Sequence, residues 1–189
     1  ASDVYKRQEP SPLGLEKAAA MIRVADKPIL LVGLGTFWDN ASSSMVSLAE
    51  HLGAPVLTTS KCKGAIIEDH PLRAGCIIGG LIERNLVSKS DLIVSIGLDA
   101  VELQPKGWPY PTKVLSIASH PSLDGLVACN EEVIGNLDSI LKILRTIVPK
   151  GNDWGYDAAK DFRASVHKAL DTPSTGLSPQ HAVEIARTI

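Results

Sequence analysis

The sequence has little that would point to a membrane, to secretion or to nucleic acid. Its 19 Lys and Arg residues nearly balance 21 Asp and Glu residues, and this net charge of −2 gives no basic surface for nucleic acid or an anionic membrane. No apolar run approaches the roughly 18 residues of a membrane span, and the polar start of the sequence lacks the pattern of a signal peptide. We therefore expect a cytoplasmic protein with neither a nucleic-acid nor a membrane partner.

Cysteine is also scarce. The three cysteines, Cys62, Cys76 and Cys129, lie far apart and form no CxxC motif. An odd number of scattered thiols is typical of a reducing compartment and predicts neither a disulfide framework nor a zinc site. We expect the three side chains to be buried or half-buried, like other small apolar residues.

Two common nucleotide-binding motifs are missing. Gly33 and Gly35 could begin a dinucleotide fingerprint, but Trp38 stands where its third glycine belongs. Thr58 and Thr59 occupy the end of the next predicted strand, where the fingerprint needs an acidic residue. No GxxxxGK[ST] sequence occurs either. These absences count against an ordinary NAD(P) oxidoreductase and against a P-loop protein.

What the sequence does contain is an alternation of aliphatic runs and amphipathic segments. The aliphatic runs predict strands buried on both faces, at residues 28–35, 55–59, 91–97 and 113–119, with a weaker fifth strand within 127–134. Apolar residues at three- and four-residue spacing predict helices over 15–22, 41–52, 137–147 and 153–170. This order predicts an α/β fold, an open parallel sheet with helices on both faces.

Polar residues and glycines mark several helix ends. Asp39 or Asn40 is the expected N-cap of the helix over 41–52, Gly53 its end, and Asn136 the N-cap of the helix over 137–147. Gly79 and Gly80 are expected to open one more short helix.

The two ends of the chain do not follow this pattern. Residues 1–8 have no helical or strand period and resemble translated read-through, so we expect a non-native segment. Residues 9–150 form the predicted domain, and residues 151–177 a helix and linker. Ser178 and Pro179 look like an N-cap and first helical residue. The helix they begin is unfinished at residue 189, which favours 178–189 as the start of a further, truncated domain. The alternative is a short C-terminal helix that docks on its own domain.

Ligands of open parallel sheets bind beyond the carboxyl ends of the strands. Small residues stand at those ends and at the start of the short helix: Gly33, Gly35, Thr58, Thr59, Gly79, Gly80, Gly97 and Ser119. One interpretation is that they bind a nucleotide-like cofactor, whose phosphates would accept hydrogen bonds from backbone N–H groups. The other is that the glycines only allow tight turns between strands and helices. Both interpretations remain open on the sequence.

The sequence offers no self-sufficient catalytic set. No Ser, Cys, His and carboxylate residues are spaced as a recognisable nucleophile and base. Asp99 and Glu102 could in principle hold a metal, but two carboxylates without further ligands are more commonly surface charge. We therefore predict no catalytic residue and no metal ligand.

A succession of short segments carries a resemblance to a known family. In order they are PILLVGLG (28–35), LAEHLGAPVLTT (48–59), KG (63–64), EDHPL (68–72) and SDLIVSIG (90–97). Together they resemble the central domain of thiamine diphosphate-dependent enzymes, the group of acetolactate synthase, benzoylformate decarboxylase and oxalyl-CoA decarboxylase. The resemblance covers roughly residues 13–149. LSPQ at 177–180 is similar to the start of the family's C-terminal pyrophosphate-binding domain.

The resemblance implies a Rossmann-like fold, of the DHS-like NAD/FAD-binding type, within an oligomeric enzyme, a dimer or tetramer. That enzyme would act on a 2-oxo acid or acyl donor as a decarboxylase or carboligase. Thiamine diphosphate and Mg2+ would be bound by flanking domains, so this chain alone is predicted to be inactive. The alternative hypothesis is a flavin- or nucleotide-binding module of the electron-transfer flavoprotein type.

Some members of the family bind FAD in the central domain, and others bind ADP or a coenzyme A moiety. The flavin contacts of the acetolactate synthase branch would fall on Gly33, Gly35, Thr58 or Thr59, and Gly79 and Gly80. The arginine expected after Gly97 is replaced by Leu98 and Asp99, and two expected acidic residues are Ser119 and Asn136. These differences count against FAD.

Overall fold

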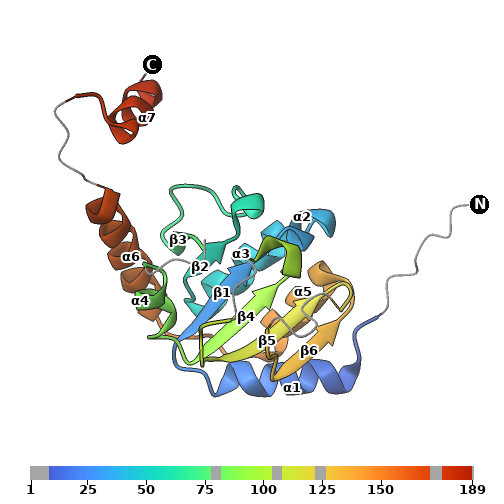
Figure 1. The fold of residues 1–189 in the computed structure, drawn as a ribbon. Coiled ribbons are helices and arrows are strands. Elements are labelled where there is room, and N and C mark those ends of the chain that lie inside the picture. The colour runs from blue at the N-terminus through green and yellow to red at the C-terminus, as the bar shows by residue number, and fades with distance from the viewer. Residues whose placement is uncertain (1–8, 78–81, 104–107, 122–126, 171–175, 189) are drawn as a thin grey trace, which may run out of the picture.

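The computed structural model describes residues 9–77, 82–103, 108–121, 127–170 and 176–188. Six strands form one sheet in the order β3-β2-β1-β4-β5-β6, and every neighbouring pair is parallel (Figure 1). The strands are β1 (Pro28–Val32), β2 (Val56–Thr58), β3 (Arg73–Cys76), β4 (Leu92–Ile96), β5 (Lys113–Ala118) and β6 (Glu131–Ile134). The predicted open parallel sheet is confirmed.

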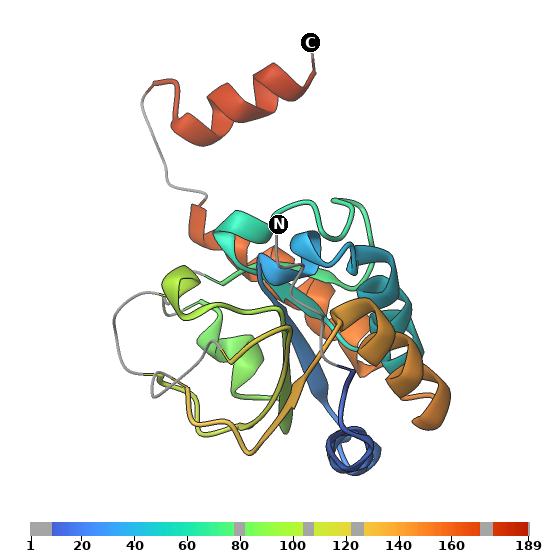
Figure 2. The same cartoon turned by 90° about the vertical axis from the view of Figure 1, so that its right-hand side faces the viewer.

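Helices cover both faces of this sheet. On one face lie α1 (Pro12–Arg23), α3 (Ser42–Leu52) and α5 (Leu137–Ile147), and on the other lie α4 (Arg84–Val87) and α6 (Trp154–Leu170). Figure 2 shows α3 and α5 on one side of the strands and α4 on the other. The shorter elements are α2 (Gly35–Trp38) and the 3-10 turns η1 (Ser60–Cys62) and η2 (Ala100–Glu102), and α7 (Pro179–Arg187) ends the described chain.

The central strands are aliphatic throughout because both of their faces are buried. In β1, Leu30 and Val32 pack with α1, α3 and α5, whereas Ile29 and Leu31 pack with α4 and α6. Successive side chains of a strand point to opposite faces, so a strand between two helical layers needs an apolar residue at every position.

The helix ends partly confirm the sequence predictions. Gly53 ends α3 in the left-handed conformation, with φ +58°, and the Asn136 side chain accepts a hydrogen bond from the N–H of Ser139 at 3.0 Å. The predicted cap of α3 is wrong, because its N-cap is Ala41, without a side-chain bond. The unpredicted helix α2 intervenes, and the Asp39 carboxylate instead accepts from the N–H of Leu137 at the start of α5.

Three glycines fasten the segment before α6 to the end of α3. Gly151 donates its N–H to the carbonyl of His51 at 2.9 Å, and Gly155 donates to the carbonyl of Gly53 at 3.0 Å. A Cβ on Gly151 or Gly155 would lie 2.1 or 2.2 Å from a backbone oxygen of that corner. We call Gly53, Gly151 and Gly155 the glycine seam, because backbone meets backbone there without intervening side chains.

Helix α6 packs against the sheet on the side of the edge strand β3. Phe162 and Ala159 are buried against the strands, and the Trp154 indole donates to the carbonyl of Pro28 at 3.2 Å. The Arg163 guanidinium donates to the backbone carbonyls of Pro71 and Arg73, at and just before β3. Helix α6 thus packs on β3 and occupies one of its backbone carbonyls, which leaves less of this edge free to pair with another chain.

Candidate functional site at the carboxyl edge of the sheet

The order in which the chain adds strands to the sheet reverses between β1 and β4. From β1 the chain adds β2 and β3 on one side, then crosses back to add β4, β5 and β6 on the other. In open parallel sheets the ligand crevice lies beyond the carboxyl ends of the two strands at such a switch point. The candidate site is therefore the space after Val32 and Ile96, where Gly33 and Gly97 begin the two loops.

The glycines of these two loops pack directly against one another. Gly33 donates its N–H to the carbonyl of Ile96, and Gly35 donates to the carbonyl of Gly97, both at 2.9 Å. Gly97 has φ +59°, and a Cβ on it would lie 2.6 Å from the backbone nitrogen of Thr36. The glycines thus allow the backbones of the two loops to approach closely. Their role in cofactor binding stays a prediction.

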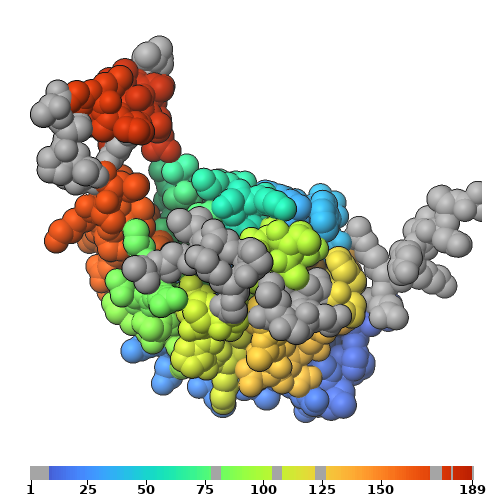
Figure 3. Space-filling model, viewed as in Figure 1, coloured from blue at the N-terminus to red at the C-terminus, as the bar shows by residue number. Residues whose placement is uncertain are grey.

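A single carboxylate joins three of the loops at this edge. Glu102 lies in η2, after β4, and its Oε2 accepts the hydroxyl proton of Thr59, after β2, at 2.6 Å. The N–H of Leu34, after β1, donates to both carboxylate oxygens at 3.0 Å. The N–H of Asp99 donates to Oε1, also at 3.0 Å. Figure 3 shows the yellow-green η2 segment next to the blue α2 and the turquoise segment that follows β2.

The interpretation of Glu102 as ordinary surface charge is wrong. Its side chain is half-buried and accepts hydrogen bonds from all three donors described above. Part of this was readable in the sequence: Asp99 and Glu102 have the spacing of a capping box, and the Asp99 side chain does accept from the N–H of Val101. The bonds from Leu34 and Thr59 have no local signal, because these residues lie 68 and 43 positions away.

The other predicted site residues are distributed along the same edge. Thr58 ends β2, is buried, and accepts the N–H of Ile77 at its carbonyl. Ser119 follows β5, and its hydroxyl is hydrogen bonded to the His120 ring at 3.2 Å. The predictions for Gly79 and Gly80 lie outside the described residues. The structure thus brings Gly33, Gly35, Gly97 and Thr59 to the switch point, with Ser119 one strand further along.

A buried thiol lies beneath the glycine turn. The Sγ–H of Cys62 donates to the carbonyl of Gly33 at 3.1 Å. Burial first, and then the negative charge of Glu102, raise the pKa of the Cys62 thiol to about 12. Cys62 is fully buried and Cys76 and Cys129 are half-buried, which confirms their predicted positions.

We expect Cys62 to resist alkylation in the folded protein. With a pKa of about 12, only about one thiol in ten thousand is ionised at pH 8, and the thiolate is the reactive form. Because the raised pKa lies above the working range, raising the pH from 7 to 9 leaves the reaction slow, and unfolding accelerates it. Mass spectrometry after iodoacetamide treatment, with the partly exposed Cys76 as internal reference, measures this. Equal rates for Cys62 and Cys76 in the folded chain would contradict it.

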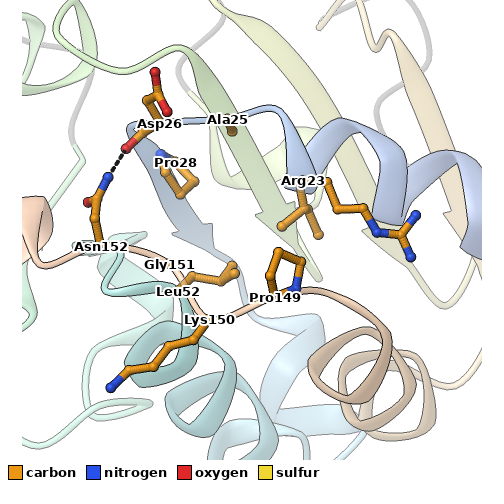
Figure 4. Close-up of a pocket in the computed structure, with 10 residues that line it drawn as sticks. Arg23, Ala25, Asp26, Pro28, Leu52, Pro149, Lys150, Gly151 and Asn152 are labelled. Carbon is orange, nitrogen blue, oxygen red and sulfur yellow. Dashed lines mark hydrogen bonds between the residues drawn. The ribbon is translucent and has the colours of Figure 1, made fainter.

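A cavity lies at the opposite, amino end of the strands. It measures about 320 Å3 and lies between the end of α1, the start of β1 and the segment after α5. In Figure 4 the Asn152 amide bonds the carbonyl of Asp26, whereas the cationic groups of Arg23 and Lys150 do not converge. Ligands of parallel sheets bind at the other end of the strands, so this cavity does not displace the switch point as the candidate site.

The described residues show neither a metal-binding cluster nor a membrane-spanning helix. Within them, no group of three or more His, Cys, Asp and Glu side chains is arranged to hold a metal ion. None of the helices within these ranges is long and apolar enough to cross a membrane.

Comparison with known proteins gives a consistent set of matches. The family model described as "Thiamine pyrophosphate enzyme, central domain" matches residues 15–144. A probable acetolactate synthase large subunit from Methanocaldococcus jannaschii is 30% identical over 139 residues, which are 70% of this chain and 24% of that protein. A sulfoacetaldehyde acetyltransferase from Roseovarius nubinhibens is 28% identical over 167 residues, 84% of this chain and 27% of that protein.

Similar folds are found among solved structures. A putative thiamin diphosphate-dependent enzyme from Mycobacterium smegmatis superposes with a TM-score of 0.69 at 28% identity, covering 79% of this chain and 30% of that one. Benzoylformate decarboxylase from Polynucleobacter necessarius, at 24% identity and a TM-score of 0.70, shares the fold. The chain thus spans about a quarter of the length of the curated relatives it matches.

Proposed function

Because this chain belongs to the family of thiamine pyrophosphate enzyme central domains, we propose that it is the central domain of a 2-oxo acid decarboxylase or carboligase. The family match over residues 15–144 carries this proposal. Acetolactate synthases and acetyltransferases among the relatives support a substrate that is a 2-oxo acid or an acyl donor. The matches favour this function over the electron-transfer flavoprotein alternative.

In this proposal thiamine diphosphate and Mg2+ are held by parts of the enzyme outside this chain. The bound coenzyme supplies the carbanion stabilisation that the reaction needs. At the carboxyl edge, Glu102 is already committed to three donors, and the Cys62 thiol stays protonated. Residues of this chain therefore act as a rigid scaffold that fixes neighbouring parts of the enzyme relative to each other.

We also propose that a further domain and other subunits adjoin this domain. Helix α7 exposes Val183 and Ile185, and Leu177 precedes it with 71% of its surface exposed. An adjoining domain beginning near residue 178 would cover these apolar side chains, with residues 151–177 as the connecting helix and linker after the central domain at 9–150. We propose a cytoplasmic homo-oligomer, a dimer or tetramer, on the analogy of the family.

The test compares this chain with the full product of its gene. We expect the 189-residue chain to show no release of carbon dioxide from pyruvate or benzoylformate with thiamine diphosphate and Mg2+, because in this proposal the coenzyme and metal are bound outside the chain. A full-length product carrying about 150 to 200 further residues on each side, one domain's worth, is expected to convert a 2-oxo acid.

A complete thiamine diphosphate-dependent decarboxylase assayed in parallel serves as the positive control. Turnover by the 189-residue chain itself would contradict the proposal, as would a full-length product without affinity for thiamine diphosphate. Flavin absorbance in the purified chain would favour either the electron-transfer alternative or a flavin-binding branch of the thiamine diphosphate family.

A further inference from the structure

The carboxyl edge raises the question of what occupies the switch point. A nucleotide bound there would place phosphate oxygens against backbone N–H groups of the loops after β1 and β4. In this chain those loops offer the N–H groups of Leu34 and Asp99, and both already donate to the Glu102 carboxylate. The Thr59 hydroxyl, the donor from the loop after β2, is bound to the same carboxylate.

We propose that Glu102 is a built-in anion that takes the place of a ligand's phosphate at the switch point, so that the native chain does not bind FAD, ADP or coenzyme A there. A carboxylate offers two oxygens that accept several hydrogen bonds, as a phosphate does. The inference concerns the sheet edge alone and is independent of the reaction that the parent enzyme performs.

The spacing around Gly33 shows how closely the carboxylate fits. A Cβ on Gly33 would lie 2.6 Å from Oε1 of Glu102 and 2.5 Å from the Gly97 carbonyl oxygen. The absence of a side chain at Gly33 thus admits the carboxylate and the facing loop to a place beside the backbone. A phosphate group could enter this place only after Glu102 had left it.

The negative charge of the carboxylates at this edge also opposes the binding of a phosphate. Asp99 and Glu102 stand two and five positions after Gly97, and both carry carboxylates. A diphosphate approaching the two loops would meet this negative charge, because both Asp99 and Glu102 lie in the segment after β4. The flavin contacts suggested by the family resemblance therefore do not fit the side chains that stand here.

A local capping role alone does not account for Glu102. Capping of η2 needs only the bond from the Asp99 N–H to the carboxylate. The bonds from Leu34 and Thr59 join two other loops that follow β1 and β2. Glu102 therefore accepts hydrogen bonds from the loops that follow three strands of the sheet, which is the arrangement that a phosphate at the switch point would need.

The test titrates the chain and two variants with inorganic pyrophosphate, ADP and FAD, following the backbone amide NMR signals of Leu34 and Asp99. We expect no saturable shift of these signals in the native chain at millimolar ligand. Glu102→Ala frees the donors and removes the negative charge, and we expect about tenfold or greater gain in pyrophosphate affinity. Glu102→Gln is the matched control: it removes the negative charge, but its amide oxygen can accept both N–H groups and its NH2 can donate to Thr59, so we expect a smaller gain than in Glu102→Ala.

Every outcome decides the proposal. Saturable FAD or ADP binding by the native chain that shifts the Leu34 and Asp99 signals would overturn it, and this measurement needs no variant. Folding of the variants is checked by thermal unfolding, and Glu102→Ser replaces Glu102→Ala if the alanine variant does not fold. A folded Ala or Ser variant that gains no pyrophosphate binding would show that the carboxylate is not what closes the edge.

Discussion

Replacing Gly53 by alanine is expected to lower the free energy of unfolding by about 3 kcal/mol or more. The residue has φ +58°, which L-amino acids rarely adopt, and a Cβ there would lie 1.8 Å from the carbonyl oxygen of Asn152. Because the obstructing atom belongs to the backbone, the end of α3 and the segment before α6 would have to separate. Urea denaturation followed by circular dichroism measures the loss.

Gly14→Ala is the matched control for that experiment. Gly14 lies in α1, and a Cβ there would meet its neighbours at 3.7 Å or more, which is ordinary contact. Alanine is the better helix former, so we expect this variant to be unchanged or more stable by about 0.5 to 1 kcal/mol. Similar stability of the Gly53→Ala and Gly14→Ala variants would show that the glycine seam is looser than described.

Leu30→Ala is expected to cost about 2 to 5 kcal/mol of stability, by removing a fully buried side chain and leaving a cavity. Leu30 is 0% exposed in the central strand β1, where it lies beside Val56 of β2 and Val94 of β4. The same substitution at Leu13, 62% exposed in α1, is expected to change stability by less than about 0.5 kcal/mol. Equal losses at the two sites, measured by thermal unfolding, would contradict the assigned core.

The sequence predicted those elements whose side chains are buried in a regular pattern. The four aliphatic strands are present, because strands covered on both faces must be apolar throughout. The weaker fifth strand is β6, an edge strand with two glutamates. Strand β3 was missed, since Arg73–Cys76 is an edge strand of mixed, small residues whose place is set by α6. Helix α2 was missed because four residues are too few to show a period.

The position of the candidate site was predictable in part from the sheet topology. The topology of a parallel sheet places strand ends together, and Gly33, Gly97 and Thr59 do meet at the switch point. The hydrogen bonds that Glu102 accepts from Leu34 and Thr59 were not predictable, because these partners lie in loops far from Glu102 in the sequence. The prediction of Asp39 as the N-cap of α3 was wrong for a similar reason, because its hydrogen-bond partner Leu137 lies 98 residues away.

The glycine seam has a consequence for where this domain can be separated from its neighbours. The family match ends at residue 144, yet two of the three seam glycines and the whole of α6 come later in the chain. A protein cut at residue 144 would leave Ala74 and the outer side of β3 open to water and to edge-to-edge aggregation. We therefore expect a separately expressed piece to be stable only if it extends to about residue 170, the end of α6.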